Sequence, residues 1–78
     1  METCHLIGEV FIKDKKYDVF EFADECGFTD LEIGPALDEE TEKVLLLIAG
    51  QIELSATSGI IEDAMWTFNR FETPIKQE

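Results

Sequence analysis

The dipeptide Gly34-Pro35 is the feature that most constrains the fold, because it separates two segments with different apolar patterns. A proline has no amide hydrogen to donate to a β-ladder, so a strand that precedes it does not continue through it. The segment before it is rich in Ile, Val, Phe and Tyr, which is typical of strands. The segment after it begins with acids and then places apolar residues at helical spacing. The sequence therefore predicts strands first and helices afterwards.

The segment before Gly34 predicts three short strands. Leu6–Lys13 and Tyr17–Ala23 are separated by the polar turn Asp14-Lys15-Lys16, which indicates a β-hairpin. After the break at Gly27, Phe28–Ile33 completes an antiparallel meander. Alternation in the first strand is imperfect, since consecutive apolar residues cannot all share one face. Both faces of the sheet are therefore expected to be partly covered.

A first helix is predicted from Glu39 to about Ser55, with Asp38 as its N-cap and acids in its first turn. Its apolar stripe contains Val44, Leu45, Ile48, Ala49 and Ile52, and a second patch roughly opposite contains Leu47 and Leu54. A helix that is apolar on two sides is either sandwiched or half of an interface. The alternative makes Val44–Ala49 a buried strand that turns at Gly50-Gln51.

A second helix is predicted from Ile60 to Phe71, capped by Ser58-Gly59 and ended by Pro74. Its apolar arc contains Ile60, Ile61, Ala64, Met65, Phe68 and Phe71. The expected fold is thus a small single α+β domain over residues 1–78, in which an antiparallel hairpin or three-stranded meander is followed by two helices packed on the sheet. Residues 1–5 and 74–78 are expected to be frayed ends.

Charge bears more directly on function. Eighteen Asp and Glu oppose six Lys and Arg, which gives a net charge of −12. Such a field repels nucleic acid and anionic membranes and attracts basic surfaces, so direct binding to DNA or RNA is not expected. The alternative is that the acids serve solubility alone. The apolar fraction of 45% is also generous for so small an interior, so part of it is expected to face a partner.

Neither a catalytic nor a metal site is predicted, and no cofactor is expected. The chain has one His and none of the nucleophile, phosphate-binding or metal-binding motifs of enzymes. A three-residue hairpin loop would place Cys4 opposite Cys26, but His5 would then point to the other face. Four zinc ligands at a workable spacing are absent, so the two cysteines are interpreted as reduced thiols in a cytoplasmic protein. No apolar run is long enough for a signal peptide or a membrane span.

The candidate partner-binding residues are one aromatic side chain and a set of acids. On the predicted second helix, Trp66 falls in the polar arc between Glu62 and Arg70, where an exposed Trp is typical of a binding anchor. The alternative is that Arg70 stacks on Trp66 or that the tail around Ile75 covers it. The expected partner-binding acids are Asp18, Glu21, Asp38, Glu39, Glu40, Glu42, Glu62 and Asp63.

These features favour a non-enzymatic inhibitor that mimics the charge of nucleic acid and blocks the basic surface of a DNA- or RNA-binding protein. In size and charge alone, the chain resembles phage-encoded anti-restriction and anti-CRISPR proteins and transcription inhibitors. That resemblance implies action in the host cytoplasm. The alternative is a small cellular adaptor or subunit, including a homodimer, that binds a partner through an apolar patch. A weaker alternative is a neutraliser of a basic toxin.

Overall fold

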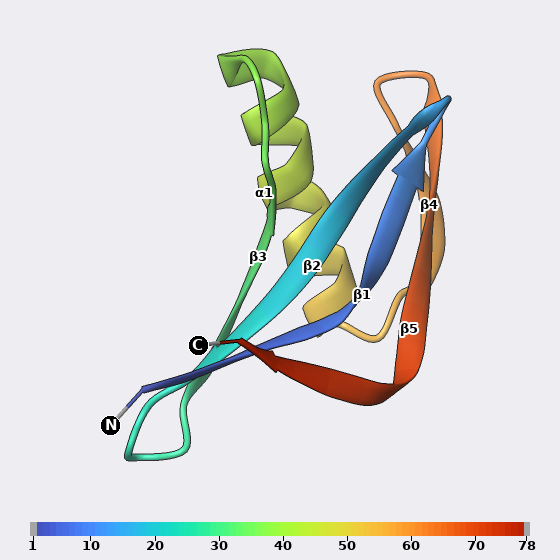
Figure 1. The fold of residues 1–78 in the computed structure, drawn as a ribbon. Helices are drawn as coiled ribbons and strands as arrows, with labels where there is room; N and C mark the ends of the chain where they lie inside the picture. Colours follow the sequence, from blue (N-terminus) through green and yellow to red (C-terminus); the bar gives the residue numbers. More distant parts are fainter. Residues whose placement is uncertain (1, 78) are drawn as a thin grey trace.

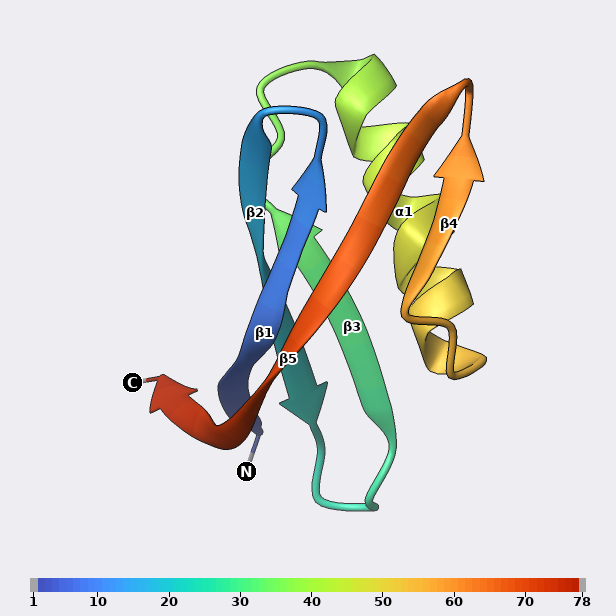
Figure 2. The same ribbon diagram turned by 90° about the vertical axis from the view of Figure 1, so that its right-hand side faces the viewer.

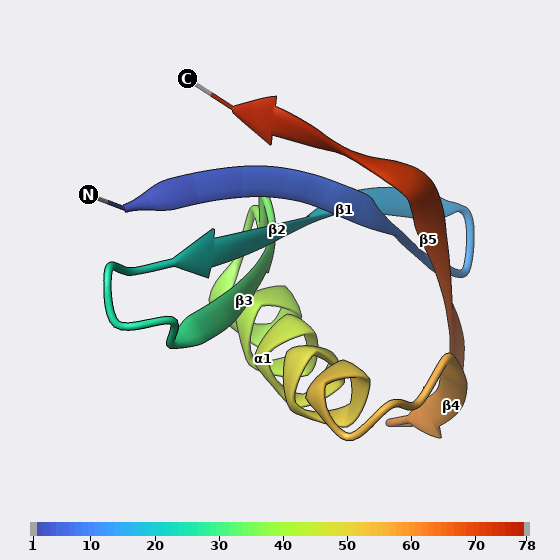
Figure 3. The same cartoon turned by 90° about the horizontal axis from the view of Figure 1, so that it is seen from below.

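The computed structural model describes residues 2–77, which form a curled five-stranded antiparallel sheet with one helix held in its concave side (Figures 1 and 3). Along the sheet the strands lie in the order β3-β2-β1-β5-β4, so β3 and β4 are the two edges. The elements in chain order are β1 (Thr3–Ile12), β2 (Lys15–Ala23), β3 (Thr29–Gly34), α1 (Glu39–Glu53), β4 (Ser58–Ile61) and β5 (Ala64–Gln77).

The predicted meander of three strands is confirmed, with a tighter first turn than expected. Lys13 and Asp14 alone join β1 to β2, and Lys13 adopts a positive φ of 55°. The register pairs Val10 with Tyr17, and a bulge between Leu6 and Gly8 shifts the pairs that follow. The bulge explains the imperfect alternation of β1, because one extra residue lets Ile7 and Val10 both reach the core.

The predicted helix is confirmed as α1, and the alternative strand at Val44–Ala49 is excluded. Asp38 is the N-cap, and its carboxylate accepts a hydrogen bond of 2.7 Å from the Thr41 amide. The expected stripe packs into the curl of the sheet, where Leu45, Ile48 and Ile52 are buried. The helix therefore closes the concave side of the sheet (Figure 2).

The predicted fold class is wrong, because the segment from Ile60 to Phe71 is no helix. It belongs to a hairpin in which β4 turns into β5 at Glu62-Asp63, and β5 then pairs with β1 in the middle of the sheet. The protein is thus mainly sheet, with one helix in its described residues, rather than a sheet followed by two helices. Aromatic and β-branched residues such as Trp66, Thr67 and Phe68 suit a strand better than a helix. Long-range pairing with β1 decides in favour of the strand.

The core lies between the concave side of the sheet and α1. The alternation that buries Trp66 and Phe68 on β5 leaves Met65, Thr67 and Asn69 exposed, which is a period of two. The buried core residues that contact one another are Ile7, Val10, Val19, Leu45, Ile48, Ile52, Trp66 and Phe68.

Residues near both chain ends belong to strands of the sheet. Thr3 to His5 belong to β1, and β5 continues through Pro74 to Gln77. Pro74 is tolerated because β5 has no pairs with β1 between Arg70 and Ile75 and no β4 partner beyond Thr67. The expected fraying of residues 1 and 78 lies outside the described residues.

Candidate protein-binding surface

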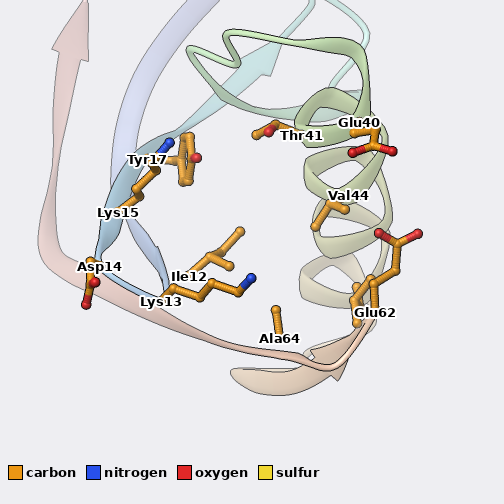
Figure 4. A pocket seen from close by; sticks show the side chains of 11 residues that line it. Ile12, Lys13, Asp14, Lys15, Tyr17, Glu40, Thr41, Val44, Glu62 and Ala64 are labelled. Carbon is orange, nitrogen blue, oxygen red and sulfur yellow. The ribbon is translucent and has the colours of Figure 1, made fainter.

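One end of the domain carries a pocket of about 370 Å³ between two hairpin turns and the first turn of α1 (Figure 4). Lys13 and Lys15 from the β1–β2 turn line it together with Glu40 of α1 and Glu62 of the β4–β5 turn. The Lys13 ammonium points into the space that these side chains surround (Figure 4). Because charges of both signs line this pocket, its field is locally compensated.

The N-cap of α1 adjoins this end. The Thr41 amide donates a hydrogen bond to the Asp38 carboxylate, and this bond holds the pKa of Asp38 below its ordinary value. The Thr41 hydroxyl and the charge of Lys15 lower that pKa further, by smaller amounts. Glu9 forms an ion pair of 2.9 Å with Lys16, which raises the pKa of that lysine. Lys13, Lys15 and Lys16 are three of the six basic residues, so basic charge is concentrated here.

A second groove, of about 280 Å³, runs between the edge strand β3 and α1. Glu32 of β3 and Glu42 of α1 are the charged residues that line it, and both side chains are exposed. The other lining residues are all apolar: Leu31, Ile33, Ala36, Leu45, Leu46 and Ala49. In contrast to the pocket at the turns, this groove has an apolar lining and charges of one sign.

The groove continues onto the side of α1 that faces away from the sheet. Leu46 is 65% exposed, Leu47 57% and Leu54 79%. Gly50 lies between these leucines, and a Cβ built on it would have no neighbour within 4 Å. The edge strands β3 and β4 lie on either side of the helix and leave this side open (Figure 3). We call the groove, together with Leu46, Leu47, Gly50 and Leu54, the α1 surface.

Trp66 does not lie where the sequence predicted it. The prediction of an exposed anchor is wrong, because Trp66 is on the inner face of β5 and only 1% exposed. Neither expected cover explains this burial, since Arg70 lies over Phe68, 5.1 Å from the ring centroid, and Ile75 pairs with Leu6 on β1. Trp66 is a core residue that no partner of the folded domain reaches.

The predicted acids lie on several separate parts of the surface. Glu39, Glu40 and Glu42 are exposed in the first turn of α1, as expected, and Asp38 caps it. Glu62 and Asp63 are exposed at the tip of the β4–β5 hairpin instead of on a helix.

Asp18 and Glu21 both lie on β2 and are half-buried. Three positions apart on a regular strand, they face opposite sides of the sheet. The structure brings Glu40 and Glu62 to one pocket but does not gather the predicted acids at one site.

The two cysteines are not neighbours across the hairpin. Cys4 pairs with Phe22, because the two-residue turn and the bulge move the register away from the one expected, and Cys26 is exposed in the β2–β3 loop. Within residues 2–77, no three His, Cys, Asp or Glu side chains are grouped so as to hold a metal ion. No helix in this part of the chain has the length and apolar character needed to cross a membrane.

Comparisons with protein-family models, with curated proteins and with solved structures found no match. The chemistry of the surface is therefore the basis for inferring a function.

Sequence patterns located part of the α1 surface. Leu47 and Leu54 were expected to form a second apolar patch on the helix, and their exposure agrees with that expectation. Leu46 and Gly50 were missed, although both occupy the outer half of the predicted helix. Sequence patterns did not single out Glu32, because only the topology places β3 beside α1, where Glu32 lines the groove.

Proposed function

We propose that this domain is a non-enzymatic inhibitor that binds the basic surface of a DNA- or RNA-binding protein and excludes the nucleic acid. One observation carries the proposal. The α1 surface has exposed leucines beside a groove that is lined by two carboxylates and by no basic residue. Protein interfaces commonly have an apolar centre and a polar rim. An acidic rim selects partners with basic surroundings, and such surroundings are typical of nucleic-acid-binding sites.

The wider charge distribution supports the same class of partner. Among residues 2–77, Lys16 forms an ion pair of 2.9 Å with Glu9. In the full sequence, eighteen Asp and Glu oppose six Lys and Arg, so carboxylates far outnumber the bases that could pair with them. Exposed carboxylates on regular elements, such as Asp30 and Glu32 on β3, are about 7 Å apart along a strand. This separation is several ångströms, of the same order as the spacing of phosphates along one nucleic-acid strand, although the charge density is lower. The proposed site of action is the cytoplasm, that of the host if the chain is phage-encoded.

A capture experiment tests this function. The immobilised domain is incubated with nuclease-treated lysate at low and high salt, and the bound proteins are identified by mass spectrometry. We expect nucleic-acid-binding proteins that added DNA or RNA releases, with retention that falls as salt rises. Retention of proteins that nucleic acid does not release would contradict the proposal.

A second candidate function is that of a small adaptor or subunit, including a homodimer, that binds through an apolar patch. The observation that favours it is that five of the six phenylalanines lie outside the buried core. On the outer face of the sheet, Leu6 pairs with both Phe20 and Ile75, which makes an apolar row. Binding through such a row is expected to change little with salt, whereas binding through the acids is expected to weaken.

A further inference from the structure

The α1 surface combines an apolar groove with carboxylates, and no basic residue lines that groove. We propose that this surface binds an amphipathic basic helix of the partner protein, with the apolar side of that helix against α1 and its Lys or Arg residues on Glu32 and Glu42. This inference rests on the proposed function and specifies its contact site and the chemistry of the partner.

The shape of the α1 surface suits a helix. Leu46, Leu47, Gly50 and Leu54 recur at helical spacing over about 12 Å of α1, which matches the side-chain rows through which two helices pack. Gly50 has open space where its side chain would be, so a partner backbone can approach closely at this point. Amphipathic helices commonly place their apolar side in such grooves.

The charges beside this surface determine which helix fits. Glu32 and Glu42 line the groove, and Glu39 and Glu53 are exposed at the two ends of α1. Lys43 is the basic residue of α1, and it lies one turn before Leu46 and Leu47 on the same side of the helix. It offsets part of the negative charge there, but it does not line the groove, where Glu32 and Glu42 are the charged residues. A helix with Lys or Arg beside its apolar stripe would complement these carboxylates, whereas an acidic or neutral helix would leave them unpaired.

A second copy of the chain is a poor occupant. Two copies would each bring a net charge of −12. In an antiparallel pair of α1 helices, the acidic first turn of one helix would lie near Glu53 and the negative end of the other. Like charges so placed oppose association. The pocket at the two turns is also less suitable for a basic helix, because Lys13 and Lys15 line it.

Chemical-shift mapping on the 15N-labelled domain tests the inference. The probe is a peptide of about 18 residues made of Leu and Lys, with the leucines on one side of a helix. A peptide of the same composition in scrambled order serves as its comparison. We expect the largest shifts on Leu46, Leu47, Gly50 and Leu54, and weaker binding of the scrambled peptide.

Matched variants distinguish binding that depends on the carboxylates of the groove from binding that depends on the overall negative charge. The double variant Glu32→Gln with Glu42→Gln should weaken binding of the peptide on the order of tenfold. The control variant Glu2→Gln with Glu72→Gln removes the same charge elsewhere and should change the affinity for the peptide little. Leu46→Ser should also weaken binding by about tenfold or more. Because Leu46, Glu32 and Glu42 are exposed, these variants should remain folded, with melting temperatures within a few degrees of the wild type.

Three results would overturn the inference. The probe could map to the outer face of the sheet, the two Glu→Gln pairs could lose binding equally, or the probe could fail to compete with a protein captured by the domain. Each would exclude the α1 surface as the contact site. The proposed function is tested separately, because it depends on whether nucleic acid releases the captured protein.

Discussion

At the scale of single residues, two glycines of the same chain have opposite surroundings. Gly59 on β4 lies opposite Trp66, and a Cβ added there would come within 2.9 Å of the indole nitrogen. A Cβ added to Gly50 on α1 would have no neighbouring atom within 4 Å. The first glycine is required for the packing of a rigid buried ring, and the second leaves an open place on the surface.

We expect Gly59→Ala to lower the free energy of unfolding by about 1–3 kcal/mol, because the added methyl group overlaps the Trp66 ring. The matched control Gly50→Ala should raise it by up to about 1 kcal/mol, since alanine favours a helix over glycine. Urea unfolding, followed through the single Trp, measures both changes. Equal effects of the two substitutions would show that Trp66 does not pack against β4.

Asp38 provides a pH-dependent test of the helix N-terminus. The hydrogen bond from the Thr41 amide lowers the pKa of Asp38 in the folded state. The ionised carboxylate therefore stabilises the fold above its unfolded pKa of about 3.9, and this stabilisation is lost as the pH falls through the pKa of the folded state. Asp38→Ala should therefore lower the urea midpoint at about pH 7, and Asp38→Asn should lower it less, because asparagine also caps helices. The advantage of wild type over Asp38→Asn should vanish as the carboxyl is protonated. An advantage that grew in acid would contradict this account of the cap.

At the scale of elements, local signals determined the first half of the fold but not the second. Asp38, the acids after it and a stripe of aliphatic residues specify α1 without help from the rest of the chain. The segment from Ile60 to Phe71 fits both a helical arc and the alternation of a strand, so local pattern alone does not decide between them. Its pairing with β1, more than fifty residues earlier in the chain, makes it a strand. The burial of Trp66 follows from that pairing, which is why a helical wheel placed it on the wrong side.

The β4–β5 turn distinguishes a hairpin from a helix by experiment. Glu62 and Asp63 have φ values of 51° and 62°, a conformation that Gly, Asn and Asp adopt more readily than Glu, and Asn-Gly is the preferred pair in such hairpin turns. We therefore expect Glu62→Asn with Asp63→Gly to stabilise the domain by about 0.5–1 kcal/mol. The same pair inside a helix would destabilise it by about 1 kcal/mol or more. A lower melting temperature in the double variant would contradict the hairpin.

At the scale of the whole molecule, the fold distributes charge unevenly. The β1–β2 turn and the strand end next to it bring three lysines to one end of the domain, where Asp38, Glu40 and Glu62 also lie. The groove beside β3 has carboxylates and no base. Net charge alone predicted a basic partner, but the place where that partner would bind depends on the topology, because β3 and α1 meet only in the folded chain. The sequence therefore indicated the chemistry of the surface better than its position.

The most direct test of the proposed function is competition with nucleic acid. A captured partner is purified and loaded with fluorescent DNA or RNA, the domain is titrated in, and the anisotropy of the nucleic acid is followed at several salt concentrations. The domain alone should leave the anisotropy of free nucleic acid unchanged, because its charge of −12 opposes a polyanion. With the partner present, we expect complete release of the nucleic acid at low salt and a release that weakens as salt rises. A ternary complex that keeps the nucleic acid bound, or a release that is independent of salt, would contradict the account.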